Sequence, residues 1–300
     1  MLKLDAPAKV NLFLRVLARE VGGFHQLETL FASLEFGDTL TFRKWEEAGV
    51  SLDTDGPHMG PPEENLVYRA AVEFLDRSGV EGGVEIHLKK RIPLQGGLGG
   101  GSSDAAATLR GLRDLFPGRL DEASLLEVAG ALGSDVPFFL VKSSLALAWG
   151  RGDRLLPLPP LPSIPVLLAF PPLGVDTSEA YGLLAKNRGE RPSDVAAKVT
   201  TLEDLTDWEG VRVLARNDFQ EALFPAFPLL SQLHEALLDQ GPLFALLAGS
   251  GASLFATFTR EEDARLAQGH LEAGFPDTRF LLTRTLATPE DPSPEVGVEP

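Results

Sequence analysis

Residues 93–107 read PLQGGLGGGSSDAAA, and five of the six residues from Gly96 to Gly101 are glycine. Glycine loses more backbone freedom on folding than any other residue, so such a run indicates a backbone that needs positive φ angles or approaches a ligand closely. A strand pattern precedes the run. An alanine-rich helix pattern follows it, with Ser102 or Ser103 as the expected N-cap. Together these features form an anion site of unpaired backbone N–H groups, so the segment predicts a phosphate-binding loop.

Two familiar nucleotide-binding motifs do not fit this loop. A Walker A motif counted from Gly96 would need lysine where the chain has Ser102. The dinucleotide fingerprint G-x-G-x-x-G, counted from Gly97, would need glycine at that same position. A flexible surface hinge would need neither a capping serine nor an alanine helix. The loop is therefore expected to belong to a different phosphate-binding motif.

The composition of the chain limits the classes of molecule that it can bind. The chain has 300 residues, 44% of them hydrophobic, a formal net charge of −16 and no cysteine. The negative charge argues against nucleic acid or an anionic membrane as a partner, because both bind basic surfaces. Without cysteine, disulfides, thiolate metal sites and a cysteine nucleophile are excluded. We expect a protein that binds a small molecule and is a monomer or a weak homodimer.

The N-terminus lacks the basic and apolar regions of a secretory signal, so we expect a cytoplasmic protein. The uncharged stretch 155–175 contains seven prolines, which would break a membrane-spanning helix repeatedly. We expect it to be a stiff connection into a buried strand and the boundary between two domains. These would cover residues 1–156 and 157–286, followed by a proline- and acid-rich disordered tail over 287–300.

Hydrophobic periodicity predicts alternating strands and helices, which favours an α+β or α/β fold over an all-β fold. Strands are expected over 9–16, 84–93, 164–170 and 279–286, within 144–158 after a loop, and as a strand–turn–strand over 243–258. Helices are expected where apolar residues recur at helical spacing, from Asn65 to Gly79 and over 102–116, 121–132, 177–187, 208–224, 229–239 and 260–273.

The loop and two further segments resemble the GHMP kinases. The segment PLQGGLGGGSS (93–103) is similar to their ATP loop, P-x-x-x-G-L-G-[GS]-[GS]-S-[SA]. APAKVNLFLRV (6–16) and LLAGSGASLFATF (246–258) fall where the family has its first and third motifs. The resemblance implies a two-domain α+β fold with the active site in the cleft between the domains. The N-terminal nucleotide domain would be ribosomal-protein-S5-domain-2-like, and the C-terminal domain a ferredoxin-like α/β sandwich.

The amino-acid sequences of these segments are similar to those of one branch of the GHMP kinases, the 4-diphosphocytidyl-2-C-methyl-D-erythritol kinase family. The similarity extends over PAKVNLFLRV, GGFHQLETLF, GLGGGSSDAAA, GSDVPFFL and GSGASLFA. It implies phosphorylation of the 2-hydroxyl of a substrate that carries a cytidine diphosphate group, with ATP and Mg²⁺, in non-mevalonate isoprenoid synthesis. One position departs from the family. Phe24 replaces the usual tyrosine before His25, so a stacking ring is retained but a phenolic hydrogen bond is lost.

The resemblance assigns Asp135 and Lys9 to catalysis. Asp135 would accept the proton of the substrate hydroxyl or orient that hydroxyl, and Lys9 beside it would neutralise developing negative charge. From the residues alone, Asp135 could equally be a turn or cap residue, and Lys9 a solvent-exposed lysine on an edge strand. Asn11 shares a strand face with Lys9 and would contact the substrate.

The other residues that the resemblance assigns divide between ATP and the substrate. ATP would be held by Pro93, Gly96, Gly97, Leu98, Gly99, Gly100, Gly101, Ser102, Ser103 and Asn65. The substrate would be held by Asn11, Phe24, His25, Thr177, Tyr181, Gly249, Ser250 and Gly251. Mg²⁺ would arrive with ATP, with the hydroxyl of Ser102 or Ser103 as a contact.

Several of these roles have an ordinary alternative. His25 would hydrogen-bond the cytosine edge, with Phe24 and Tyr181 stacked on the base, but Tyr181 could equally be a core aromatic. Asn65 would lie near the adenine or cap a helix. Thr177 would contact the substrate's diphosphate or cap a helix.

Two other functions stay open. The chain could be another GHMP enzyme, such as a homoserine or mevalonate kinase or a diphosphomevalonate decarboxylase. The Phe24–His25 pair argues against these, because their small substrates have no base to bind. It could also be a sensor that binds ATP and a metabolite without catalysis. The presence of both Lys9 and Asp135 argues against a sensor.

Overall fold

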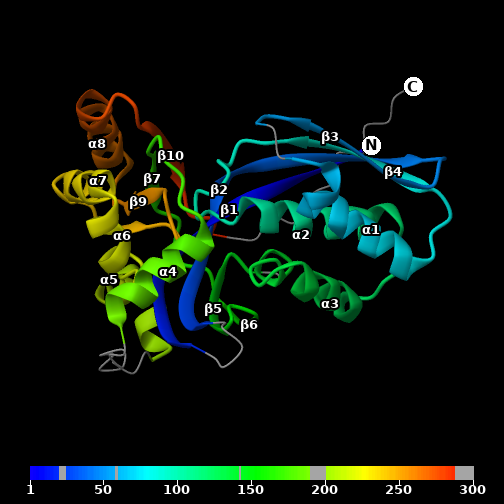
Figure 1. Ribbon diagram of the computed structural model, residues 1–300, viewed down its shortest axis with the longest axis horizontal. Coiled ribbons are helices and arrows are strands. Elements are labelled where there is room, and N and C mark those ends of the chain that lie inside the picture. Colours follow the sequence, from blue (N-terminus) through cyan, green and yellow to red (C-terminus); the bar gives the residue numbers. More distant parts are fainter. Residues whose placement is uncertain (20–24, 58–59, 142, 190–200, 288–300) are drawn as a thin grey trace.

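The computed structural model describes residues 1–19, 25–57, 60–141, 143–189 and 201–287. Phe24 lies outside the described residues, as does all of the expected tail except residue 287. The described chain forms two lobes, each built from one sheet with helices packed on it (Figure 1). This arrangement confirms the expected α+β class.

The N-terminal lobe contains a six-stranded sheet in the order β3-β4-β2-β5-β6, with β1 paired to β2. Its strands are β1 (Leu2–Arg19), β2 (His25–Trp45), β3 (Gly49–Asp55), β4 (Gly83–Lys89), β5 (Leu145–Gly150) and β6 (Arg154–Leu158). One face is covered by helices (Figure 1), which are α1 (Leu66–Ser78), α2 (Gly100–Leu115) and α3 (Glu122–Leu132). Short 3₁₀ turns are η1 (Pro62–Glu64) and η2 (Pro137–Phe139).

Helix α1 shows how the local sequence determines an element of this lobe. The Asn65 side chain accepts a hydrogen bond from the Val67 N–H and caps the helix, and Gly79 ends it with a φ of 60°. The residues that α1 buries recur every three or four positions and join the core under the sheet, and these are Val67, Ala70, Ala71 and Phe74.

The C-terminal lobe contains a four-stranded antiparallel sheet in the order β10-β7-β9-β8. Its strands are β7 (Pro165–Phe170), β8 (Phe244–Leu247), β9 (Leu254–Thr257) and β10 (Arg279–Arg284). The helices are α4 (Thr177–Arg188), α5 (Trp208–Leu214), α6 (Gln220–Ala226), α7 (Pro228–Leu238) and α8 (Glu261–Gly274), with a 3₁₀ turn η3 (Glu203–Leu205). The βαββαβ order and the 4-1-3-2 strand arrangement are those of a ferredoxin-like sandwich.

A shared core joins the two lobes. One buried cluster contains apolar residues from β1 and β2 together with residues from β7 and β9, among them Val10, Leu30, Val166 and Phe255. Backbone contacts reinforce it, since the Leu286 N–H donates to the Ser33 carbonyl at 2.9 Å. The chain passes from one sheet to the other between Leu158 and Pro165. The division into domains at residues 156 and 157 stays a prediction.

Two expected boundaries were wrong around the glycine loop. Strand β4 ends at Lys89 and not at Pro93, because the Ile92 N–H turns away and donates to Asp38 Oδ1 at 2.8 Å. Helix α2 begins at Gly100, and neither Ser102 nor Ser103 is its N-cap. Gly99 has that position, with a φ of 70°, and its carbonyl accepts the first helical hydrogen bond at 2.9 Å.

The single helix expected over 208–224 was also wrong. Helices α5 and α6 are separated at residues 215–219, where Asn217 forms a parallel bridge with Leu14 of β1. A distant strand therefore overrides the local helical pattern. The strand expected over 9–16 is part of the longer β1, and residues 25–55 contain β2 and β3, for which no element was expected.

Candidate active site

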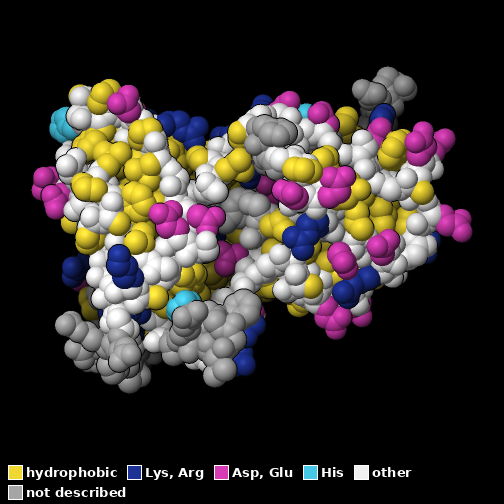
Figure 2. All heavy atoms as spheres, viewed as in Figure 1, with side chains coloured by type: hydrophobic (Ala, Val, Ile, Leu, Met, Phe, Trp, Pro, Cys, Tyr) yellow, Lys and Arg dark blue, Asp and Glu magenta, His cyan; other side chains and the backbone are white. Residues whose placement is uncertain are grey.

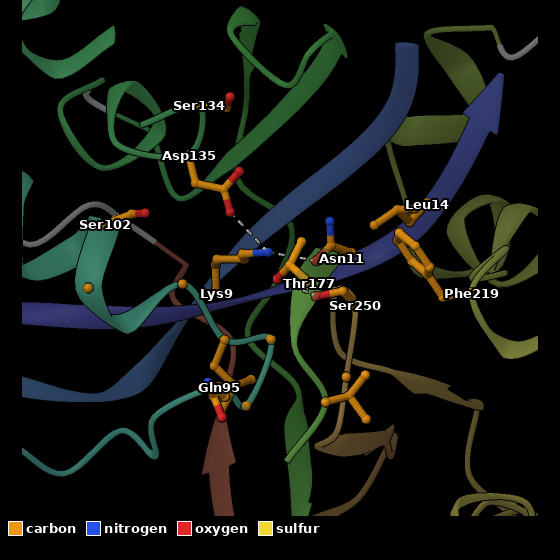
Figure 3. Close-up of a pocket in the computed structure, with 18 of the residues that line it drawn as sticks. Lys9, Asn11, Leu14, Gln95, Ser102, Ser134, Asp135, Thr177, Phe219 and Ser250 are labelled. Carbon is orange, nitrogen blue, oxygen red and sulfur yellow. Dashed lines mark hydrogen bonds and ion pairs between the residues drawn. The ribbon is translucent and has the colours of Figure 1, made fainter. Parts of the chain in front are cut away.

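A cavity of about 820 Å³ lies between the lobes. Its walls are β1, the glycine loop before α2, the turn before η2, the start of α4 and the turn between β8 and β9 (Figure 3). The segments that resemble the three GHMP motifs, far apart in sequence, thus border one space. Figure 2 shows Asp and Glu side chains distributed over the visible face of both lobes with Lys and Arg among them. With a formal net charge of −16, negative ligands must be held by local groups rather than by a basic surface.

The glycine loop is packed so closely that side chains would not fit. A Cβ on Gly97, whose φ is 74°, would lie 1.9 Å from the Ala248 carbonyl oxygen. A Cβ on Gly100 would lie 2.8 Å from Lys90 Nζ. The N–H groups of the first turn of α2 have no partner within the helix. The residues from Gly97 to Ser102 line the cavity, so this first turn fits a phosphate group.

The two candidate serines differ in position. Ser102 lines the cavity. Ser103 is fully buried, and its hydroxyl has no hydrogen-bond partner among the described residues. Those residues contain no cluster of three or more His, Asp or Glu side chains that could hold a metal ion. Of the two serines, only Ser102 lines the cavity, so its hydroxyl is the one available to a ligand bound there.

Lys9 and Asp135 form an ion pair in the cavity, with 3.3 Å between Nζ and Oδ2 (Figure 3). The Lys9 side chain is 5% exposed, whereas the Asp135 carboxylate is 33% exposed. Lys9 Nζ also donates to Asn11 Oδ1 at 2.8 Å, and Asn11 in turn donates to Thr29 Oγ1 at 2.8 Å. The ammonium is therefore held by neighbours on β1 and β2, and the carboxylate faces open space. An accessible carboxylate with a fixed cation is suited to accept a proton from a bound hydroxyl.

A buried triad that the sequence did not reveal lies behind the glycine loop. Lys90 Nζ donates to Asp38 Oδ2 at 2.5 Å and to Asp104 Oδ2 at 2.7 Å. Burial raises the pKa of Asp104 to about 8. Burial alone would lower the pKa of Lys90, but the Asp104 and Asp38 carboxylates raise it above its ordinary value. The triad ties the end of β4 to the first turn of α2 and thus fixes both ends of the loop.

The opposite end of the cavity is aromatic. The His25 and Tyr181 rings are stacked, with centroids 4.5 Å apart and an angle of 16° between their planes. Phe219 meets Tyr181 edge-on at 4.9 Å. Burial, with a smaller contribution from the negative charge of Asp135, raises the pKa of Tyr181 to about 12. The phenol therefore stays neutral and remains a hydrogen-bond donor at physiological pH.

Polar side chains line the cavity besides the ion pair and the glycine loop. Thr177 Oγ1 lies 3.0 Å from Ser250 Oγ, and both residues line the cavity (Figure 3). Arg151, on the turn between β5 and β6, also lines it, although the sequence pattern did not single it out. Nor did it single out Phe219. Neither residue belongs to a recognisable motif.

Most of the expected site residues meet at this cavity. Those that line it are Lys9, Asn11, His25, Pro93, Gly96, Gly97, Leu98, Gly99, Gly100, Gly101, Ser102, Asp135, Thr177, Tyr181, Gly249, Ser250 and Gly251. Asn65 and Ser103 do not, and Asn65 serves as the cap of α1. Thr177 is not a cap, because Asp176 caps α4 by accepting from the Ser178 N–H at 2.8 Å.

Comparison with known proteins agrees with this geometry. Residues 65–143 match the model of the GHMP kinases N-terminal domain, and residues 201–277 match that of the GHMP kinases C-terminal domain. A 4-diphosphocytidyl-2-C-methyl-D-erythritol kinase of Pelotomaculum thermopropionicum is 38% identical over 280 residues, which cover 93% of this chain and 96% of the relative. The same enzyme of Moorella thermoacetica is 38% identical, with 95% and 99% covered. The chain belongs to the 4-diphosphocytidyl-2-C-methyl-D-erythritol kinase family.

Solved structures agree with membership of this kinase family. A crystal structure of 4-(cytidine 5'-diphospho)-2C-methyl-D-erythritol kinase has a TM-score of 0.77 and 37% identity, and the match covers 94% of this chain and 98% of that one. A homoserine kinase from Cytophaga hutchinsonii has a TM-score of 0.70 at 20% identity, which shows the shared fold alone. As a GHMP kinase, the protein is a small-molecule kinase with ATP as its phosphate donor. No helix among its described residues has the length and apolar character of a membrane span.

Proposed function

We propose that the protein transfers the γ-phosphate of ATP to the 2-hydroxyl of 4-diphosphocytidyl-2-C-methyl-D-erythritol in non-mevalonate isoprenoid synthesis. The observation that carries the proposal is the position of the Lys9–Asp135 pair. It lies in one cavity with the glycine loop and with the His25–Tyr181 rings. A site of this kind holds a triphosphate and a base-bearing alcohol at once.

In the proposed reaction, Asp135 accepts the proton of the substrate hydroxyl as its oxygen attacks the γ-phosphorus. The new O–P bond forms while the bond to the β,γ-bridging oxygen breaks, and ADP leaves with that oxygen. Lys9, held by Asn11, offsets the negative charge that develops on the attacking oxygen. The N–H groups at the start of α2 bind the phosphates and align them with the hydroxyl.

The substrate's diphosphate is proposed to lie between Arg151 and the Thr177–Ser250 pair, which supply a cation and two hydroxyl donors. His25 is proposed to hydrogen-bond the cytosine edge, with Tyr181 as the stacking surface. Bound Mg²⁺ would neutralise charge on the phosphate oxygens, near Ser102. The substrate role assigned to Phe24 stays a prediction, as do a cytoplasmic location and a monomeric or weakly dimeric state.

Release of ADP, measured with a panel of alcohols, tests the proposal. The panel contains 4-diphosphocytidyl-2-C-methyl-D-erythritol, 2-C-methyl-D-erythritol 4-phosphate without the cytidyl group, homoserine and mevalonate. We expect turnover with the first compound to exceed that with each of the others by at least about 10²-fold, because only it uses the base-binding end of the cavity. Equal turnover of homoserine or mevalonate would contradict the proposal.

A further inference from the structure

The segment between α5 and α6 places a buried asparagine where the two lobes meet. Asn217 is 5% exposed. Its Nδ2 donates to the carbonyls of Leu247, at 2.8 Å, and Gly249, at 2.7 Å. Its Oδ1 accepts from the Phe219 N–H at 3.0 Å. Only one orientation of the carboxamide satisfies all three bonds, because the flipped amide would direct its oxygen at two carbonyl oxygens.

The backbone at Asn217 is bound to β1, the strand that carries Lys9. Leu14 exchanges two backbone hydrogen bonds with the residues on either side of Asn217, at 2.8 and 3.0 Å. The fully buried carboxylate of Asp218 accepts from the Val16 N–H at 2.8 Å. The backbone at Asn217 is therefore fixed relative to the strand that carries Lys9.

The groups that Asn217 binds belong to two different walls of the cavity. Gly249 begins the turn that lies against the glycine loop, where a Cβ on Gly249 would lie 2.7 Å from the Gly97 carbonyl oxygen. Phe219 lines the aromatic end and contacts Tyr181. Asn217 itself does not line the cavity. One carboxamide thus connects the phosphate end of the cavity with its base end.

We propose that Asn217 is a positioning residue for phosphoryl transfer, which holds the β8–β9 turn against the glycine loop and Phe219 against Tyr181. The proposal rests on the assignment of these two ends of the cavity to ATP and to the cytosine base. An asparagine suits this position because it offers two donors and one acceptor without charge. An aspartate has nearly the same shape, but the oxygen in place of Nδ2 would face the carbonyl oxygens of Leu247 and Gly249 and repel them.

The test is Asn217→Asp, with Asn187→Asp as the matched control. Asn187 is on α4 and donates one exposed hydrogen bond to the Glu221 carbonyl at 3.2 Å. At a temperature well below unfolding, we expect Asn217→Asp to raise KM for both ATP and the cytidyl alcohol and to lower kcat. The combined loss in kcat/KM should be about 10²-fold, as for a shift of about 1 Å in a reacting group. Asn187→Asp should match wild type.

A structural role alone would lower the melting temperature and leave kcat and both KM values of the folded protein unchanged, which would overturn the proposal. A change in KM for only one of the two substrates would also overturn it, because only one wall would then depend on Asn217. If Asn217→Asp does not fold, the same kinetic measurements on Asn217→Ser test the proposal, since serine keeps one donor and adds no charge. Wild-type kinetics for that variant, or failure to fold, would remove Asn217 from a positioning role.

Equilibrium binding of ATP to each variant keeps this test separate from the proposed function. If the wild-type protein binds ATP but does not phosphorylate the cytidyl alcohol, the proposed function fails. Weaker ATP binding by Asn217→Asp than by Asn187→Asp would still support the effect of Asn217 on the glycine loop. Equal ATP binding by the two variants would overturn that effect whatever the alcohol substrate is.

Discussion

Lys9 Nζ and Asp135 Oδ2 lie 3.3 Å apart, although one residue belongs to the first strand and the other to the turn before η2. The pair is asymmetric, because the ammonium is buried and the carboxylate is partly open to the cavity. A carboxylate held in place by a buried cation can accept a proton and stay in position while it does so. This arrangement makes Asp135 the group on which turnover should depend most.

Asp135→Asn should lower kcat by about 10²–10⁴-fold, because an amide keeps the shape of the side chain but cannot accept the hydroxyl proton. KM for ATP should change by no more than a few-fold, since the phosphates bind to the glycine loop. Release of ADP measures both constants. Asp76→Asn, on the exposed face of α1, is the control and should match wild type. Turnover of Asp135→Asn within tenfold of wild type would exclude the proposed role.

His25→Ala should weaken binding of the cytidyl alcohol more than binding of ATP. Loss of a stacking and hydrogen-bonding ring costs about 1–3 kcal/mol per base, which corresponds to a rise in KM of about 5–150-fold. KM for ATP should stay close to wild type. His87→Ala is a suitable control, because His87 is on β4, does not line the cavity and pairs with Asp53 of the neighbouring β3. An equal loss of affinity for both substrates would place His25 outside the base-binding end.

Gly97→Ala should lower both ATP affinity and the melting temperature, because its Cβ would overlap the Ala248 carbonyl oxygen. Gly118→Ala separates this overlap from backbone strain. Gly118 has a φ of 75°, nearly the same as Gly97, but nothing lies within 4 Å of its Cβ position. The control should cost only the strain of a left-handed alanine, about 1–2 kcal/mol. Equal effects of the two substitutions would show that close packing of the loop is not the cause.

The buried triad predicts an unusual pH dependence of stability. Burial raises the pKa of Asp104 to about 8 in the folded state, against an ordinary value of 3.8. The folded protein therefore retains a proton that the unfolded chain releases. This contribution to stability is fully present below pH 3.8 and is lost as the pH rises through about 8. As the pH rises over this range, the melting temperature of wild type should fall relative to that of Asp104→Asn, which has no such proton.

The same triad predicts that its two carboxyl groups respond differently to neutralisation. Burial favours the neutral form of Asp104, so Asp104→Asn should change the melting temperature at pH 7 less than Asp38→Asn does. Asp38→Asn removes the charge opposite Lys90, and it replaces one of the two acceptor oxygens with an NH₂ group that must face either Lys90 or the Ile92 N–H. It should lower the melting temperature by several degrees, since breaking a buried pair is costly. Equal melting temperatures for the two variants would contradict the assignment.

The fold class and the phosphate-binding loop could be predicted because their signals are local, whereas the roles expected of Lys9 and Asp135 came from the resemblance to the kinase family. The glycine loop and the period-two pattern around Lys9 are each readable within a short window of sequence. The start of α2 was misplaced because a serine is the usual cap. Here Gly99 adopts the left-handed conformation and begins the helix within the glycine run.

The groups that the sequence missed depend on contacts between distant segments. Asp38 is on β2, Lys90 follows β4 and Asp104 is on α2, and no spacing rule relates the three residues. Likewise, Asn217 lies within a pattern that favours one continuous helix, and its pairing with Leu14 of β1 interrupts that helix. Local periodicity carries no information about such partners, because the competing hydrogen bonds belong to a strand near the other end of the chain.

Gly97 and Gly249 each lack room for a side chain. A Cβ on Gly249 would overlap the carbonyl oxygen of Gly97, and a Cβ on Gly97 would overlap the carbonyl oxygen of Ala248, the residue before Gly249. A mutation at either position therefore cannot be accommodated by small rearrangements of side chains, since the obstacle is main chain. Lineages that descend from this protein should keep both glycines or lose both together, with a changed path of the two turns. The two segments, far apart in the gene, should therefore evolve as one unit.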